Sequence, residues 1–247
     1  YTIIVYIQGG FQLTKNSQFY RQNYCHIFSM SKRKEKMYFR ITIPALQDGK
    51  KDEAISFVKD KVMPEFDGTP GLISMTAAIT GETSGINMSA YESNEASDAV
   101  GETVQATLAE AASFMAAPPV IYEGEAVFGK VYQNISKDEK KPGYMRLVVG
   151  VAKETDAVLN FLKEKVEPIY EDSDGLQITG ALFDGNSAIS WNIWDTQEAM
   201  DSAVEKLQGA LDSESESDLF DGSTVAYMGP VYAGKLFVDF KEGETPN

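Results

Sequence analysis

The chain has 247 residues and a formal net charge of −15, with 43% hydrophobic and 24% charged residues, the makeup of an ordinary globular protein large enough for two small domains. No run approaches the roughly 18 apolar residues that a membrane-spanning helix needs, so we expect a cytoplasmic protein without membrane contact. The acidic surplus repels phosphate backbones and argues against nucleic acid as a partner.

Residues 1–36 differ from the rest of the chain in charge and composition. They hold six Lys or Arg residues against one acidic residue, a net charge of +5, which leaves −20 for residues 37–247. They also contain the single cysteine, Cys25, and the single histidine, His26. Their apolar residues follow neither a helical nor an alternating pattern. We therefore expect a non-native or disordered leader with Met30 or Met37 as the native start, the alternative being a basic targeting arm.

After the leader, the chain reads twice as strand, helix, strand, strand, helix, strand. The first pass predicts strands at 38–46, 72–79, 86–91 and 120–132 and helices at 52–66 and 94–115. A polar linker follows at 134–143. The second pass predicts strands at 144–151, 176–183, 188–194 and 224–237, helices at 155–170 and 196–211, and a tail at 241–247.

The two passes align with each other and indicate an internal repeat. Residues 58–75 (VKDKVMPEFDGTPGLISM) match residues 162–179 (LKEKVEPIYEDSDGLQIT) at a shift of 104 positions. The last strands match at a shift of 105, which pairs Gly124 with Gly229. The shift changes in turns, where insertions are tolerated better than in strands. The sequence therefore predicts tandem repeats at 37–133 and 144–240.

Each repeat has the order of the ferredoxin-like α+β fold, a four-stranded antiparallel sheet with both helices on one face. The other face of such a sheet is left bare, and its residues here are too apolar to face water. A second, similar sheet is the natural cover. We therefore predict that the two repeats pack sheet to sheet as a barrel within one chain, an intrachain pseudo-dimer that leaves further homo-oligomerisation open.

Four segments of the repeats resemble a known family, the antibiotic biosynthesis monooxygenase-like dimeric α/β barrels. They are DEAISFVKDKVMPEFDGTPGL (52–72), AYESNEASDAV (90–100), DAVLNFLKEKVEPIYEDSDGL (156–176) and IWDTQEAMDSAV (193–204). The resemblance implies a pocket between the two sheets, or between each sheet and its helices. It also implies oxidation of quinols, polyketide aromatics or haem, in several members without a metal or flavin. Haem-degrading members use a helical histidine as iron ligand. Because no histidine follows residue 26, the sequence argues strongly against that branch, and no cofactor is expected.

The third strand of each repeat carries the candidate pocket residues. Side chains alternate along a strand, so three residues of each strand share a face: Asn87, Ser89 and Tyr91 in the first repeat, and Ser190, Asn192 and Trp194 in the second. The spacing of Asn87 and Tyr91 resembles the Asn and Trp pair of cofactor-free family members, although neither repeat keeps the full pair. These residues either line a wet cavity or pack in the barrel with their amides hydrogen-bonded.

Neighbouring residues are assigned to other roles. Met88 and Trp191 point the opposite way on the same strands, and we expect them to face the helices as core residues. Arg40 and Arg146 stand at nearly matching places on the two first strands, where each either clamps an anionic oxygen in the cavity or is a solvated edge charge. Tyr232, on the last strand, either donates to a ligand oxygen or packs across strands.

Two functions remain open at this point. The first is a small-molecule-binding barrel that acts, if it is an enzyme, as a cofactor-independent monooxygenase on an apolar aromatic or quinol-like substrate. The second is a non-catalytic barrel that serves as a binding or interaction module. A pocket of roughly 300 Å³ edged by Asn87 or Asn192 favours the first, and a filled interior favours the second. Without His or Cys in the repeats, nucleophile systems that use an imidazole or a thiol are excluded.

Overall fold

The computed structural model describes residues 36–139, 143–213 and 216–245. The leader expected at 1–36 therefore lies, apart from Lys36, outside the described residues. Within the described ranges, no helix combines the length and the apolar character needed to cross a lipid bilayer.

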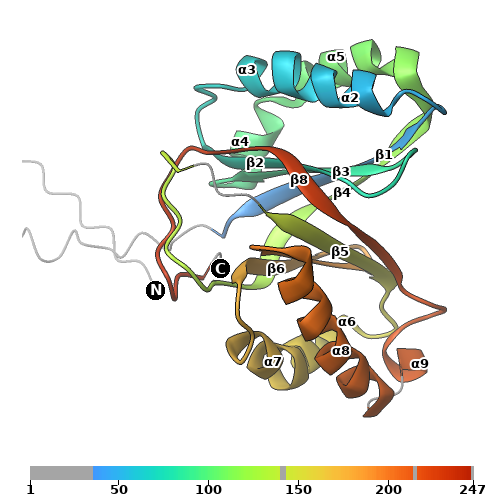
Figure 1. Cartoon of the computed structure of the whole chain (residues 1–247), viewed down its shortest axis with the longest axis vertical. Helices are drawn as coiled ribbons and strands as arrows, with labels where there is room; N and C mark the ends of the chain where they lie inside the picture. The colour runs from blue at the N-terminus through green and yellow to red at the C-terminus, as the bar shows by residue number, and fades with distance from the viewer. Residues whose placement is uncertain (1–35, 140–142, 214–215, 246–247) are drawn as a thin grey trace, which may run out of the picture. The chain divides into compact units, whose positions relative to one another are not determined.

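Both halves contain the predicted succession of elements (Figure 1). The first half consists of β1 (Tyr38–Leu46), α2 (Lys51–Phe57), η1 (Val58–Val62), α3 (Met63–Glu65), β2 (Leu72–Ile79), β3 (Gly85–Tyr91), α4 (Asn94–Asp98), α5 (Gly101–Ala111), η2 (Ala112–Phe114) and β4 (Met115–Val131). The second half consists of β5 (Tyr144–Val151), α6 (Thr155–Phe161), η3 (Leu162–Val166), α7 (Glu167–Glu171), β6 (Leu176–Asp184), β7 (Ser187–Trp194), α8 (Gln197–Ser213), α9 (Glu216–Leu219) and β8 (Val225–Leu236).

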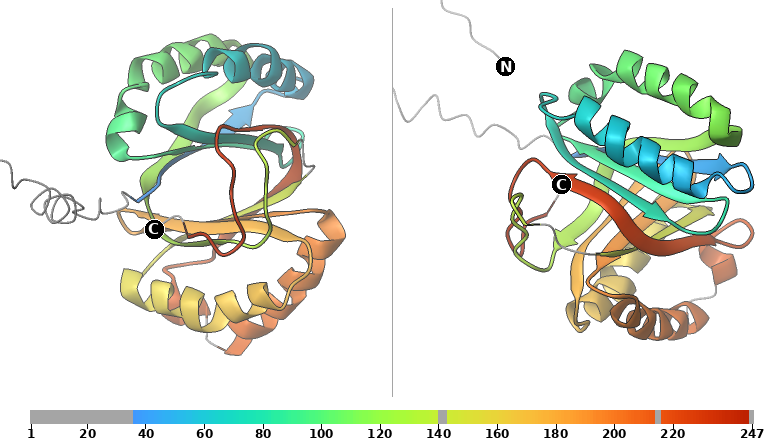
Figure 2. Two further views of the ribbon diagram at one scale, coloured as in Figure 1. Left: turned by 90° about the vertical axis from the view of Figure 1, so that its left-hand side faces the viewer. Right: turned by 45° about the horizontal axis from the view of Figure 1, so that its top comes forward.

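The strands form one closed barrel in the order β1-β3-β2-β8-β5-β7-β6-β4. Each half supplies four neighbouring antiparallel strands, and its long last strand crosses to the other half: β4 pairs with β6, and β8 pairs with β2. The helices lie outside the barrel, one layer against each half (Figure 2). The fold is therefore a dimeric α/β barrel of two ferredoxin-like halves in a single chain, as predicted.

The space between the two sheets is a packed apolar core. Its fully buried side chains come from both halves, among them Ile41 and Ile86 of the first and Leu147 and Leu182 of the second. Phe39 and Trp191 meet across the halves with their ring centroids 4.5 Å apart. Each sheet thus covers the apolar face of the other, which confirms the reason given above for the pairing of the repeats.

This core corrects the expected orientation of the third strands. Met88 and Trp191 are buried at 5% and 1% exposure, as expected of core residues, but they belong to the core between the sheets. They do not face the helices. Because neighbouring strand residues alternate, the candidate pocket residues on β3 and β7 face the helices instead.

Two glycines at equivalent repeat positions allow the last strands to cross. A Cβ atom on Gly124 would lie 2.9 Å from the carbonyl oxygen of Phe183, and a Cβ atom on Gly229 would overlap the carbonyl oxygen of Ile79. Phe183 and Ile79 are themselves 104 positions apart, so the same crossing occurs twice. The glycine pair found in the sequence therefore marks the close backbone approach that joins the halves.

The helices differ in detail from the predicted ranges. The first helix of each half contains a π-helical turn, η1 or η3, that ends two residues before a proline, Pro64 or Pro168. A proline ring clashes with the carbonyl four residues earlier, and the wider π-turn gives it room. The helix expected at 94–115 is divided into α4, α5 and η2, and β4 begins at Met115, five residues before the predicted strand. The expected tail is tied to the barrel, because Val131 donates its N–H to the carbonyl of Glu244.

Candidate functional site

Each half has a cavity between the helix layer and the sheet. The first has a volume of about 130 Å³ and the second about 90 Å³. Both are lined mainly by apolar side chains from the helices and the sheet; in the first cavity those of the helices include Phe57, Val58, Leu108 and Phe114. The family resemblance implied a pocket either between the two sheets or between each sheet and its helices. Both of these cavities lie between a sheet and its helices.

The polar lining of the first cavity comes from neighbouring strands. Asn87 and Ser89 of β3 lie on the cavity wall, and Thr42 of β1 is directly opposite Asn87 in the strand pairing. None of the three side chains has a hydrogen-bond partner in the described part of the chain. An amide and two hydroxyl groups on an otherwise apolar wall are therefore open to a ligand.

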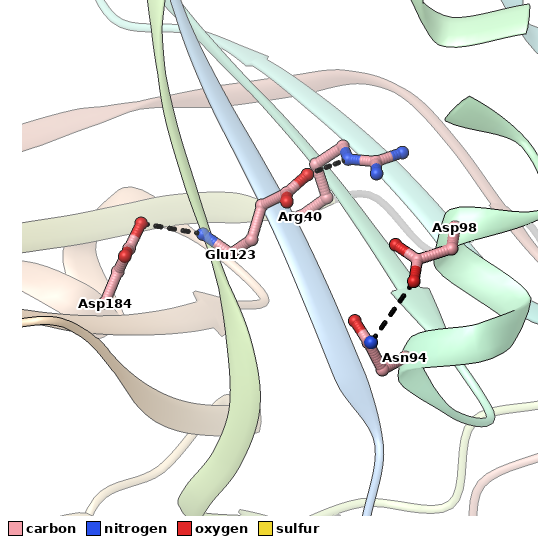
Figure 3. A network of polar contacts seen from close by, with 5 residues as sticks. All are labelled: Arg40, Asn94, Asp98, Glu123 and Asp184. Carbon is pink, nitrogen blue, oxygen red and sulfur yellow. Dashed lines mark hydrogen bonds and ion pairs between the residues drawn. The ribbon is translucent and has the colours of Figure 1, made fainter. Parts of the chain in front are cut away.

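Arg40 is buried beside these groups. It lies opposite Ser89 and Glu123 in the barrel, is 8% exposed, and its Nε donates to the Glu123 carboxylate (Figure 3). The backbone N–H of Glu123 in turn donates to Asp184 of the second half at 3.2 Å. The Nη1 atom of Arg40 is buried without a partner, and its Cζ lies 5.8 Å from the centre of the Tyr91 ring. The expectation of a solvated edge charge is therefore wrong for Arg40.

The second half also contributes to the first cavity. Tyr232 of β8 is half-buried and lines it, because β8 pairs with β2. Burial raises the pKa of Tyr232 well above its ordinary value, so the phenol keeps its proton at neutral pH and can donate it in a hydrogen bond. The ammonium of Lys59 lies 5.9 Å from the centre of its ring.

The second half uses its candidate residues differently. Ser190 lines the second cavity, whereas Asn192 and Trp194 are buried behind it at 1% and 0% exposure. Trp194 donates from Nε1 to the Asn192 Oδ1 at 2.7 Å, and Asn192 donates from Nδ2 to the Tyr170 hydroxyl oxygen at 2.9 Å. The Asn192 amide is therefore hydrogen-bonded in the protein, while the Asn87 amide is not.

The arginines of the two cavities have different neighbours. Arg146 lies opposite Asn192 and lines the second cavity, just as Arg40 lies opposite Ser89 and lines the first. At the strand position where Arg40 has Glu123, Arg146 has Met228. Burial lowers the pKa of Arg146, and its Nε has no hydrogen-bond partner. A solvated edge charge is therefore the wrong description of Arg146 as well.

The structure brings together most, but not all, of the residues that the sequence singled out. Asn87, Ser89 and Tyr91 share the first cavity, and Ser190 alone of the second set reaches the second. Sequence reasoning missed Thr42, although its alternation with Arg40 on the first strand was a usable signal. It also missed Tyr170, whose partner Asn192 lies 22 positions away. In the described ranges, no group of three or more His, Cys, Asp or Glu residues is arranged to hold a metal ion.

We expect the two asparagines to differ in their effect on stability. Asn192→Ala leaves the buried Trp194 N–H without an acceptor and should lower the free energy of unfolding by about 2 kcal/mol. Asn87→Ala removes no hydrogen bond and should change it by less than about 1 kcal/mol. Urea unfolding of both variants measures the difference, and equal losses would contradict the asymmetry.

Comparisons with known proteins bear on the fold alone. No family model and no curated protein matches the chain. A candidate monooxygenase of known structure from Fusobacterium nucleatum matches at a TM-score of 0.67 with 10% identity, covering 84% of this chain and 99% of that one. A second, from Lactobacillus acidophilus, matches at 0.62 with 12% identity, covering 83% and 99%. An anthrone oxidase-like protein matches at 0.57 with 14% identity, covering 82% and 94%. At these identities the matches show a shared dimeric α/β barrel fold.

Proposed function

We propose that the chain binds a small, largely apolar aromatic molecule with a phenol or quinol hydroxyl in the first cavity. The observation that carries this proposal is the set of unpartnered polar groups, Asn87, Ser89 and Thr42, on one wall of an apolar cavity. The apolar lining favours a ring, and the amide and hydroxyl groups favour an oxygen substituent on it.

The volume limits the size of the ligand. The first cavity, at about 130 Å³, is smaller than the roughly 300 Å³ expected of a substrate pocket and smaller than drug-sized pockets. It is close to the roughly 150 Å³ of an engineered apolar cavity that holds benzene. We therefore assign a ligand with a single aromatic ring.

A monooxygenase reaction on this ligand is the second part of the proposal. The fold shared with candidate monooxygenases supports it, as does Arg40, whose Nη1 is buried without a partner and can donate a hydrogen bond to the substrate oxygen. In the reaction, one atom of dioxygen enters a ring carbon that carries hydrogen, opposite the hydroxyl in a simple phenol or next to it in a quinol, and gives a quinone. The other atom leaves as water with the hydrogen of that carbon and the hydroxyl hydrogen, so no external reductant is consumed.

The side chains that line the cavity also determine whether the protein can remove a proton from the substrate. The lining contains no carboxylate, imidazole, amine or thiol side chain that could act as a base. The substrate must therefore lose its own proton, and the Nη1 of Arg40 can donate a hydrogen bond to the oxygen that is left. This requirement favours quinols and acidic phenols over simple hydrocarbons as substrates.

Cavity filling tests the binding site. One-ring phenols and hydroquinone should raise the thermal midpoint of the wild-type chain, because a ligand of the native state stabilises it by mass action. Ala111→Leu places a larger side chain in the cavity and should abolish the rise. The matched control, Ala109→Leu, changes an exposed position of the same helix and should keep it.

The outcomes separate binding from catalysis. If no phenol raises the midpoint, or if Ala109→Leu and Ala111→Leu respond alike, the site is wrong. If phenols bind but an oxygen electrode records no dioxygen uptake above that of the free phenol, the monooxygenase reaction is wrong. The protein is then a non-catalytic binding barrel.

A further inference from the structure

The second cavity collects hydrogen-bond donors that lack acceptors. Arg146, Tyr170 and Ser190 all line it, from β5, α7 and β7 respectively. Tyr170 is 3% exposed, so its hydroxyl has no access to bulk water. Buried donors are normally satisfied, and a set of unsatisfied ones in a cavity needs an explanation.

The hydrogen-bond chain behind the cavity leaves the Tyr170 proton without an acceptor. The indole N–H of Trp194 is only a donor, so it must meet the oxygen of the Asn192 amide. The amide nitrogen then donates to Tyr170, whose hydroxyl oxygen is the acceptor in this bond. The Tyr170 hydroxyl hydrogen has no acceptor in the described part of the chain. Because the chain polarises the phenol in one direction, it makes Tyr170 a stronger donor.

Arg146 places an uncompensated positive charge beside this donor. In the described ranges no carboxylate forms an ion pair with it, and Met228 occupies the position at which Glu123 neutralises Arg40. Arg146 and Tyr170 interact electrostatically, and the Arg146 Nε is enclosed without a partner. Enclosing part of a cation without a counter-ion is costly, and an anion is the group that would relieve this cost.

We propose that the second cavity binds a small carboxylate, whose oxygens accept hydrogen bonds from the Arg146 guanidinium and the Tyr170 hydroxyl. Ser190 is a third donor on the same wall. Apart from Thr224, the rest of the lining is apolar, including Val158, Phe161 and Leu207, and the volume of about 90 Å³ suits a short aliphatic tail. The ligand is therefore a short-chain fatty acid or an acid of similar size.

The first half lacks the groups that form this proposed site. At equivalent repeat positions it has Phe66 in place of Tyr170 and Ser89 in place of Asn192, and Glu123 already neutralises its arginine. The polarised phenol and the free cation thus occur together only in the second half of the described chain. This site is independent of the proposed phenol site in the first cavity.

Nuclear magnetic resonance of the indole N–H groups tests the proposal on the full chain. The protein has two tryptophans: Trp194 lies at the start of the hydrogen-bond chain, and Trp191 lies in the core between the sheets. Butyrate should shift the Trp194 indole resonance in a saturable way and leave that of Trp191 in place. Butyramide, which has the same shape without the charge, should not. No saturable shift, or an equal response to butyramide, would overturn the proposal.

Variants identify the groups that bind. Tyr170→Phe copies the residue of the first half and should weaken butyrate at least about tenfold, the loss of one hydrogen bond to a charged group. Arg146→Met should abolish binding, whereas Lys163→Met, which removes the same charge from an exposed site on η3, should keep wild-type affinity.

A stability readout separates binding from a structural role. Arg146→Met should keep or raise the thermal midpoint of the ligand-free chain, because it removes a partly buried charge that lacks a counter-ion. If the midpoint falls instead, or if butyrate binds both variants as it binds the wild type, Arg146 and Tyr170 are structural and the proposal is wrong.

Discussion

Trp191→Ala is expected to lower the free energy of unfolding by about 3–5 kcal/mol, the usual cost of truncating a large buried aromatic residue. The Trp191 side chain is 1% exposed and lies in the core that both sheets share, against Phe39 of the other half. The space for its indole exists because Gly180 has no side chain: a Cβ there would lie 2.6 Å from the Trp191 Cε2. Removing the indole therefore opens a void between the halves.

Urea unfolding followed by two probes measures this effect. Circular dichroism reports on both halves, and once Trp191 is removed the tryptophan fluorescence comes from Trp194 alone. Both midpoints should fall together, because the halves share one core. Trp191→Phe keeps most of the apolar volume and should cost less than about 2 kcal/mol. Separate midpoints, or a loss below about 1 kcal/mol for Trp191→Ala, would show that the halves are stable independently.

Gly229→Ala is expected to be nearly as damaging although it adds one methyl group. The new Cβ would overlap the carbonyl oxygen of Ile79 and lie 2.6 Å from its carbonyl carbon. The backbone carbonyl of Ile79 cannot rotate away from the new methyl group as a side chain could. The strands β8 and β2 must therefore separate where the two halves join. We expect a loss of about 3 kcal/mol or more, at the upper end of the cost of overpacking.

Gly234→Ala is the matched control on the same strand. A Cβ at Gly234 would have its nearest neighbour, the Met75 carbonyl oxygen, at 3.6 Å, an ordinary contact distance. This variant should change the free energy of unfolding by less than about 1 kcal/mol. Equal losses for the two variants would mean that alanine harms β8 for a reason other than the close approach to Ile79.

The two halves share a scaffold but differ in their cavities. The differences fall at equivalent positions of the repeats: Phe66 and Tyr170, Ser89 and Asn192, Glu123 and Met228. Each exchange alters polarity or charge beside the arginine of a cavity without changing the order of the strands. We infer from this pattern that the duplicated frame supplies stability while the cavities supply function, one site for an aromatic ring and one for an anion.

The sequence by itself determined the architecture because the signals for it are local or repetitive. The period of apolar residues marked the strands, glycines marked the turns, and the match of residues 58–75 with 162–179 marked the repeat. An apolar sheet face without a cover then required the second half as its partner. None of these signals depends on distances between residues in the folded chain.

Only the tertiary structure decided which face of each sheet holds a cavity and which groups in it lack partners. Alternation places Asn87 and Met88 on opposite faces but does not say which face meets the helices. Equally, the states of Arg40 and Arg146 depend on Glu123 and Met228, which pair with them from strands over 80 positions away. Hydrogen bonding and charge compensation are properties of neighbours in space, so they appear only when the barrel has closed.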